Sequence, residues 1–191
     1  MLFRSTPDKK DIYITIGITE GEKYTVSEVK VGGQLLIPEE EVRKMITIKS
    51  GEVFSRGKLT ESTKKISDRL GNDGYAFANV NAAPELNKEK KEAAFTFFID
   101  PGRRVYVRRI NVAGNTRTRD EVIRREMRQV EGGWYAVDKI TLSKQRIDRL
   151  GYFNEVNVET PAVQGTTDQV DVNVSVIEKP TGSIQIGRAH V

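Results

Sequence analysis

Few residues in this sequence could support catalysis or bind a metal ion. The 191-residue chain contains no cysteine and a single histidine, His190, which is the penultimate residue. One imidazole supplies neither the set of ligands that a metal ion needs nor a nucleophile with its base. The acidic run Glu39–Glu41 falls within one predicted helix turn, where its charge complements the helix N-terminus. We therefore expect a protein that is not an enzyme and has no catalytic residues, metal site or cofactor.

One motif is compatible with nucleic-acid binding. Gly71-Asn72-Asp73-Gly74 has the GXXG form of the loop with which KH domains hold an RNA backbone, and the sequence pI is about 9.2. A KH loop joins two helices, whereas this motif follows the second predicted helix and places Asp73 where a phosphate would lie. We interpret it as a helix end, with Gly71 in the left-handed conformation, followed by a turn. A KH-like nucleic-acid-binding protein remains the alternative from a different functional class.

The basic residues are unevenly distributed along the chain. The formal net charge is +4, and nine arginines gather early in the second half of the sequence. They are Arg103, Arg104, Arg108, Arg109, Arg117, Arg119, Arg124, Arg125 and Arg128. A solvated surface is the simplest explanation, and an acidic partner or an anionic lipid surface is the alternative. No run approaches the roughly 18 apolar residues of a membrane-spanning helix, and the lack of cysteine fits either a cytosol or a periplasm.

Two stretches, 23–33 and 104–114, share one apolar pattern at a separation of 81 residues. The equivalent pairs are Val26 and Val107, Val29 and Ile110, Val31 and Val112, and Gly33 and Gly114. In both stretches the apolar spacing changes from two to three at the same place, which predicts a strand with a bulge before a glycine turn. Each stretch is followed by two predicted helices, the second ending in Arg-Leu-Gly, and by two alternating strands. The sequence is therefore an internal duplication of a β-α-α-β-β unit.

The second repeat contains the clearer helix signals. Thr118-Arg-Asp-Glu121 is predicted to be a capping box that starts the first helix of this repeat. The side chains predicted on the buried face of that helix are Ile123, Met127 and Val130. Trp134, beside Gly132 and Gly133, is expected in the core or at a contact between domains.

An additional strand is predicted before the first repeat. Isoleucines 12, 14, 16 and 18 alternate along residues 11–18 and would share one face. The strand takes the place, relative to the first repeat, that 93–99 takes relative to the second, so residues 1–22 are interpreted as the last strand of a preceding unit. Such a strand lacks a partner, and we expect it to be disordered or to pair with a sheet edge of a neighbouring molecule.

The repeats resemble polypeptide-transport-associated (POTRA) domains, in particular those of outer-membrane β-barrel assembly factors. The strings that carry the resemblance are Thr6-Pro-Asp-Lys-Lys10, Arg124-Arg-Glu-Met-Arg-Gln129, Asp168-Gln-Val-Asp-Val172 and Thr181-Gly-Ser183. The resemblance implies an α+β fold with two tandem domains, each a three-stranded mixed sheet with two helices on one face. It assigns 23–102 to a fourth POTRA domain, 103–180 to a fifth, and 181–191 to the start of a barrel strand and a tail.

The resemblance also implies a function. Proteins of this kind are periplasmic scaffolds that receive unfolded outer-membrane proteins and dock assembly lipoproteins near the lipid surface. An exposed edge strand would bind an extended client by β-augmentation, without nucleic acid or a small-molecule substrate. A POTRA module of a two-partner secretion or import pore is a further alternative.

Two sets of candidate site residues follow. Main-chain pairing with clients is expected at the edges 78–83 and 155–160, each followed by a proline. The candidate client-binding residues are Ala78, Val80, Ala82, Val156 and Val158. The resemblance implies that Glu131 pairs with the lipoprotein BamD. Arg124, Arg125 and Arg128 are expected to form a basic surface beside it.

Overall fold

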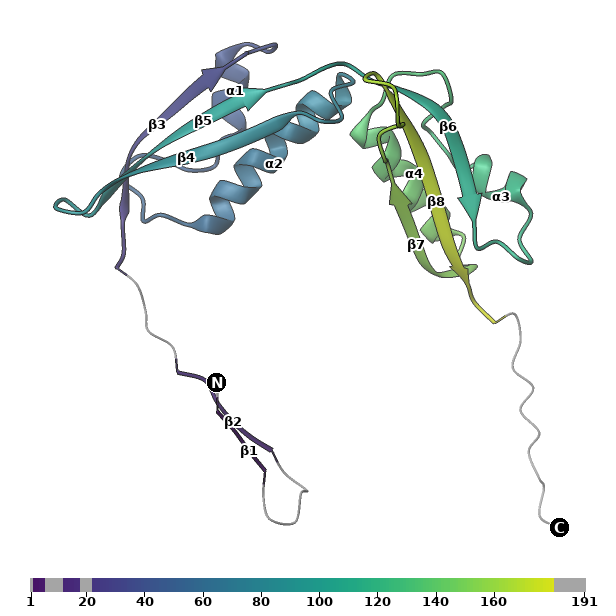
Figure 1. Ribbon diagram of the computed structural model, residues 1–191, viewed down its shortest axis with the longest axis horizontal. Coiled ribbons are helices and arrows are strands. Elements are labelled where there is room, and N and C mark those ends of the chain that lie inside the picture. Colours follow the sequence, from purple (N-terminus) through teal and green to yellow (C-terminus); the bar gives the residue numbers. More distant parts are fainter. Residues whose placement is uncertain (1, 6–11, 18–21, 181–191) are drawn as a thin grey trace.

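The structure is a computed structural model that describes residues 2–5, 12–17 and 22–180. Two α+β units follow one another along the chain (Figure 1). The first consists of β3 (Thr25–Gly33), α1 (Glu39–Met45), α2 (Arg56–Asn72), β4 (Asn79–Asn87) and β5 (Glu92–Asp100). The second consists of β6 (Tyr106–Ala113), α3 (Asp120–Arg124), α4 (Val137–Arg149), β7 (Phe153–Glu159) and β8 (Gln169–Glu178).

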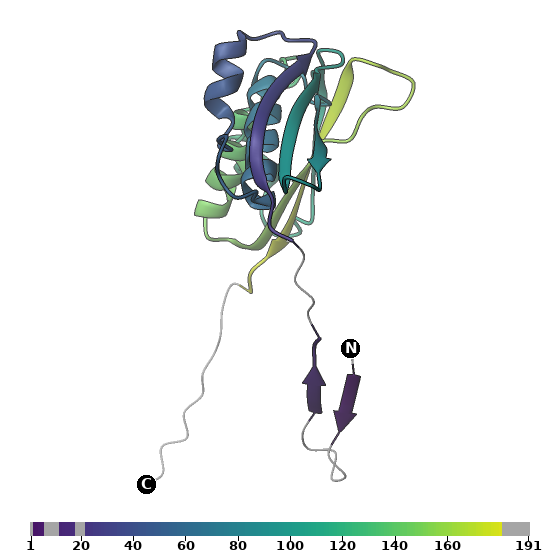
Figure 2. The ribbon, with the colours of Figure 1, turned by 90° about the vertical axis from the view of Figure 1, so that its left-hand side faces the viewer.

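Each unit is built on a three-stranded mixed sheet. The strand orders are β3-β5-β4 and β6-β8-β7, so the last strand of each unit lies in the middle. The first strand of the unit pairs with it in parallel, and the second strand, β4 or β7, pairs with it antiparallel. The helices cover one face of each sheet, as Figures 1 and 2 show together. The predicted fold class is confirmed.

The repeated strand pattern produces the predicted irregularity in both units. The register shifts between Val26 and Val29 in β3, and between Val107 and Arg109 in β6. The glycines that end these strands, Gly33 and Gly114, have φ of 96° and 86°. A Cβ at either position would collide with a carbonyl oxygen of the central strand. Glycine is therefore required there for its left-handed backbone and for the close approach.

The alternating strands and the helix stripes form one apolar core in each unit. The first core contains Val26, Val42, Ile48, Ile66, Leu70, Phe95, Phe97 and Ile99. The second contains Val107, Ile110, Ile123, Met127, Ile147, Val156, Val172 and Val174. A buried serine on the second helix of each unit binds the segment that follows the first helix. Ser62 Oγ accepts the Thr47 N–H at 2.9 Å, and Ser143 Oγ accepts the Arg128 N–H at 2.8 Å.

The predicted first helix of the second repeat is wrong in two respects. No capping box forms, because the Thr118 N–H donates to Glu178 Oε1 at 2.7 Å and Arg119 is the N-cap, without a side-chain hydrogen bond. The α-helix ends at Arg124, so the helical period does not extend to Val130, which is 58% exposed. Gln129, and not Val130, is buried in the core of the second unit.

The end of α2 also differs from the prediction. Gly71 is helical and buried, and the left-handed residue is Gly74, with φ of 101°. The helix continues past Gly71 because its end contacts the second unit. A Cβ on Gly71 would collide with the side chain of Val137, so the glycine permits close packing between α2 and α4.

Asn72 links the two units at the same place. Its Nδ2 donates to Asp138 Oδ2 at 2.7 Å, and its Oδ1 accepts the Asp138 N–H at 2.8 Å. Ala136, the N-cap of α4, offers no side-chain acceptor. Asn72 therefore caps α4 from the neighbouring unit.

The predicted unpaired strand near the N-terminus has a partner within its own molecule. β2 (Ile12–Thr15) pairs antiparallel with β1 (Leu2–Ser5), a strand that the sequence did not indicate. This hairpin gives no support to the idea that the segment imitates a client on a sheet edge. The predicted barrel strand in 181–191 lies outside the described residues.

Candidate interaction surfaces

Two strands, β4 and β7, are the antiparallel edges of their sheets. Each pairs on one side only within the described residues. Val80 and Ala82 pack against the first core, and Val156 and Val158 against the second. These side chains therefore face inward, and a bound peptide would contact the backbone of the edges instead. Ala78 precedes β4 and is not part of that strand.

Proline has different places in the two edges. The sequence predicted that the first edge ends before Pro84. This prediction is wrong, because Pro84 pairs with Phe95 and β4 continues to Asn87. Proline lacks an N–H, so it is compatible with an edge strand but removes a donor from it. β7 ends at Glu159, before Pro161, whose carbonyl oxygen accepts the Asp171 N–H at 3.0 Å.

The opposite edges, β3 and β6, are covered at their N-terminal ends. In the first unit the Val26 N–H donates to the Glu52 carbonyl at 2.8 Å, and the Gly51 N–H donates to the Val26 carbonyl at 2.7 Å. In the second unit Val107 exchanges the same two bonds with Gly133 and Gly132, at 2.9 and 2.7 Å. The segment after the first helix thus protects part of each edge.

Glu131 lies where this protection continues along β6. Its Oε1 accepts the Ile110 N–H at 2.7 Å. Arg124 Nη2 donates to the Ile110 carbonyl at 2.9 Å, and Arg124 Nη1 lies 3.6 Å from Glu131 Oε1. Both side chains remain nearly half exposed. The sequence indicated Glu131 as a partner contact but did not reveal that it binds the backbone of its own sheet.

The three predicted arginines have different environments. Arg124 donates to the Ile110 carbonyl and forms ion pairs with Glu131 and Asp120. Arg125 is 66% exposed, 3.4 Å from Glu126. The exposed side chain of Arg128 makes no hydrogen bond or ion pair with any described residue. Arg125 and Arg128 therefore form the accessible part of the predicted basic surface.

Trp134 is exposed over half its surface and lies between basic and aromatic groups. The Arg104 guanidinium lies 4.3 Å from its ring centroid, and Tyr106 packs edge-on at 6.4 Å. Arg104 Nε also donates to the Asp73 carbonyl at 2.6 Å. Trp134 therefore lies outside the core, and it packs on Arg104, the residue that binds Asp73 of the first unit.

The GXXG motif is engaged in that same contact. In addition to the bonds of Asn72 and Asp73, the Gly74 carbonyl accepts the Val105 N–H at 2.8 Å. Three of its four residues therefore bind the second unit or the linker to it. This arrangement disfavours the KH-like alternative, in which the loop must remain open to phosphates.

Gln129 is a structural residue that the sequence analysis missed. It is 1% exposed, and its Nε2 donates to the Trp134 carbonyl at 3.0 Å while its Oε1 accepts the Ala136 N–H at 3.1 Å. Its amide holds the loop between α3 and α4 in place. A polar residue in the loop between two helices carries no periodic signal that would have distinguished it.

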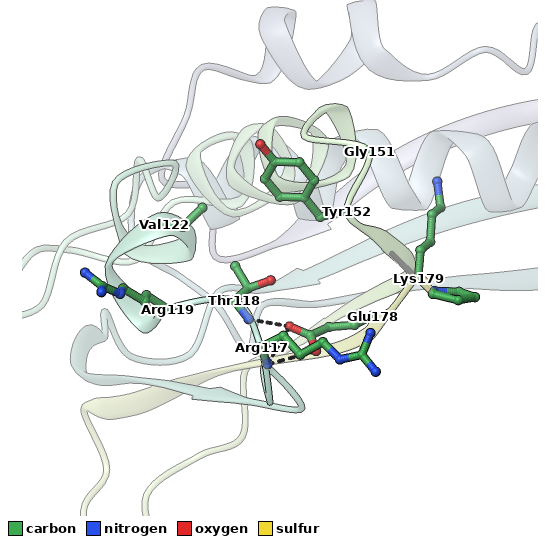
Figure 3. Close-up of a pocket in the computed structure, with 9 residues that line it drawn as sticks. Arg117, Thr118, Arg119, Val122, Gly151, Tyr152, Glu178 and Lys179 are labelled. Carbon is green, nitrogen blue, oxygen red and sulfur yellow. Dashed lines mark hydrogen bonds between the residues drawn. The ribbon is translucent and has the colours of Figure 1, made fainter. Parts of the chain in front are cut away.

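A cavity of about 580 Å³ opens at the far end of the second unit (Figure 3). Glu178 lies on its wall and accepts bonds from Thr116 Oγ1, the Arg117 N–H and the Thr118 N–H. These donors, the Thr118 backbone first, lower the pKa of Glu178 to about 2. The basic side chains around the cavity point in different directions, so they do not converge on a single anion.

Other site classes have no counterpart in the part of the chain that the structure describes. Within it, no group of three or more His, Cys, Asp or Glu side chains is placed to bind a metal ion. None of its helices has the length and apolar composition of a membrane span.

The fold and the repeat define a class of protein. The POTRA family, described as a surface antigen variable number repeat, matches residues 24–102 and 105–179. The chain belongs to the POTRA family. Within it, the chain is similar to the later POTRA domains of the outer membrane protein assembly factor BamA.

The most informative relatives are bacterial assembly factors. BamA of Neisseria meningitidis is 36% identical over 98% of this chain, and that of Buchnera aphidicola is 34% identical over 96%. The chain spans 24% and 30% of the lengths of these relatives. It therefore corresponds to a part of them.

Solved structures give the same result. The crystal structure of POTRA domains 3–5 of Haemophilus influenzae BamA matches with a TM-score of 0.83 and 32% identity, covering 92% of this chain and 70% of that one. Haemophilus ducreyi BamA lacking POTRA domains 1–3 matches with a TM-score of 0.69 and 36% identity, covering 84% and 30%.

Proposed function

We propose that the chain is the fourth and fifth POTRA domain of an outer-membrane β-barrel assembly factor, acting as a non-catalytic scaffold in the periplasm. Its clients are unfolded outer-membrane proteins, which pair as extended strands with the edges β4 and β7. The observation that carries the proposal is the outer backbone of these two strands, which pairs with no strand among the described residues. Backbone pairing tolerates many client sequences because the side chains alternate away from the ladder.

Cross-linking from single cysteines tests the client edges. The chain contains no cysteine, so Asn81→Cys on β4 and Asn157→Cys on β7 each introduce a unique attachment point at an exposed position. Each should capture a maleimide-bearing peptide from a transmembrane β-strand. Lys64→Cys, on the exposed face of α2, is the matched control. Equal capture at Lys64 would contradict edge-specific binding, and so would equal capture of a peptide N-methylated along one edge.

The second part of the proposal concerns assembly lipoproteins, with BamD as the expected partner of the Glu131 surface. That surface combines the half-exposed carboxylate with Arg125, Arg128 and the exposed apolar side chains of Val130 and Trp134. Exposed aromatic and apolar groups beside charges are typical of docking surfaces.

Two substitutions at Glu131 separate charge from structure. Glu131→Lys removes both the charge and the acceptor for Ile110, whereas Glu131→Gln keeps an acceptor and removes only the charge. Both should weaken binding to purified BamD, by about tenfold or more for the lysine. If only the lysine variant is impaired, the effect comes from the β6 edge, and Glu131 is not the docking charge.

The alternative functions have distinct signatures. A KH-like protein would bind single-stranded RNA with strong salt dependence, whereas a POTRA scaffold should not. A module of a two-partner secretion or import pore would bind its own secreted substrate in preference to outer-membrane protein peptides. Retention of RNA at physiological salt would overturn the proposal.

A further inference from the structure

Both backbone groups of Ile110 are bound by side chains at the outer edge of β6. The N–H donates to Glu131 Oε1 at 2.7 Å, and the carbonyl accepts from Arg124 Nη2 at 2.9 Å. In an antiparallel ladder, a residue of the neighbouring strand binds the same two groups with its own C=O and N–H. The carboxylate and the guanidinium therefore take the place of one residue of a neighbouring strand.

This pair extends a segment that already pairs with β6. Tyr135 N–H donates to the Val105 carbonyl at 3.1 Å, and Gly133 and Gly132 exchange two bonds with Val107. An isolated bridge between Tyr106 and Trp134 has antiparallel geometry. Backbone pairing ends at Gly132, and the side chains of Glu131 and Arg124 continue it by one position.

The first unit has the same segment without this extension. At the separation of 81 residues, Ser50 takes the place of Glu131 and Val29 that of Ile110. Ser50 Oγ donates to the Ser27 carbonyl, and Arg43, the counterpart of Arg124, pairs with Glu39. No described side chain binds the backbone of Val29. β3 is thus open from Val29 onward, whereas β6 is covered at the matching residue.

We infer that the β6 edge from Ile110 to Ala113 is a further acceptor site for an extended peptide, closed by the Arg124–Glu131 pair. The occupant is a strand running antiparallel to β6, as the covering segment does. The pair is displaceable because both side chains are exposed, 43% and 48%, and their closest charged atoms are 3.6 Å apart. Exposed pairs of this kind contribute little to stability.

This inference goes beyond the proposed function, which uses β4 and β7. A partner that draws Glu131 into an ion pair of its own would leave the Ile110 N–H unpaired. The inference that such docking opens the edge rests on the proposed function. The existence of the covered edge does not, since it depends only on the groups that bind Ile110.

Exchanging the equivalent residues Glu131 and Ser50 in the full chain tests whether Glu131 closes the β6 edge. Glu131→Ser gives β6 the residue of the first unit, and Ser50→Glu gives β3 the residue of the second, with Arg43 available to complete the pair. A single cysteine at the exposed Ala113 or Lys30 captures a maleimide-bearing peptide of alternating threonine and valine at β6 or β3. The same peptide with N-methyl groups along one edge is the control.

Glu131→Ser should raise capture at Ala113→Cys roughly tenfold, because two covering hydrogen bonds are lost or weakened. It should also accelerate hydrogen exchange of the Ile110 amide, while Ser50→Glu should lower capture at Lys30→Cys. Faster exchange without increased capture would overturn the inference. If Glu131→Ser does not fold, the Ser50→Glu variant provides the test. Unchanged peptide capture at Lys30→Cys in that variant would overturn the inference. Capture at Asn81→Cys and Asn157→Cys reports separately on the proposed function.

Discussion

The two units have the same fold, and they differ at positions where the second unit fixes its loops and covers a sheet edge. Both units contain the same backbone features, including the bulged first strand, its final glycine and the buried serine of the second helix. Three of the differences change the polarity or charge of a side chain. Ile48 becomes Gln129, Ser50 becomes Glu131, and Ile37 becomes Thr118.

These differences replace apolar or small side chains of the first unit by polar residues. The side chains of Gln129 and Glu131 accept the backbone N–H groups of Ala136 and Ile110, whereas Thr118 donates its own N–H to the Glu178 carboxylate. The comparison teaches that the common fold depends on the shared positions, whereas the second unit uses the others to fix its loops and close an edge.

The largest effect is expected at the glycine that both units require. Gly114→Ala should lower the free energy of unfolding of the second unit by at least about 3 kcal/mol. A left-handed backbone alone costs a side chain about 1–2 kcal/mol, and here the Cβ also meets the Val176 carbonyl. Urea unfolding followed by the fluorescence of Trp134, the single tryptophan, measures this unit. Gly165→Ala, with φ of 80° but open space, should show the backbone cost alone.

A smaller effect is expected where the units differ in the core. Gln129→Ile copies the first unit and should cost about 1–3 kcal/mol, because the Ala136 N–H loses its acceptor in a buried place. Val130→Ala, an exposed neighbour, should change stability by less than about 0.5 kcal/mol in the same fluorescence assay. If Gln129→Ile left the free energy of unfolding unchanged, the two cores would be interchangeable at this position.

The sequence predicted what depends on periodicity and on the duplication. The β-α-α-β-β order, the bulges of β3 and β6 and the core positions Val42 and Ile123 follow from apolar spacing that appears twice. A pattern seen in two copies separates signal from chance, so these elements were found with little ambiguity.

The sequence could not predict contacts between distant polar groups. Thr118 and Glu121 form a local capping pattern, yet Glu178, 60 residues away, takes the Thr118 N–H. Gly71 has the local features of a helix end, but packing against Val137 keeps it helical. In both cases a tertiary partner overrides a local preference, and one sequence does not reveal that partner.

An effect of about the size of a helix cap is expected at the contact between the units. Asn72→Ala removes the side chain that caps α4 from the first unit, and it should cost the second unit about 1 kcal/mol. The Trp134 transition should shift to lower urea concentration. Asn87→Ala, which removes two similar backbone bonds in the β4–β5 turn, is the control and should leave that transition unchanged. An equal shift in both variants would argue against capping between units.

The smallest effect concerns a carboxylate with no equivalent role in the first unit. The donors around Glu178 lower its pKa from an ordinary 4.5 to about 2. A group with a lowered folded pKa stabilises the fold above its unfolded pKa and loses that contribution as the pH falls through the folded one. The wild-type protein should therefore exceed Glu178→Gln in stability above pH 4.5. The difference should shrink between pH 4.5 and about 2, as measured by urea unfolding at a series of pH values. A difference that stays constant over this interval would show that Glu178 holds the 116–118 loop by its shape and not by its charge.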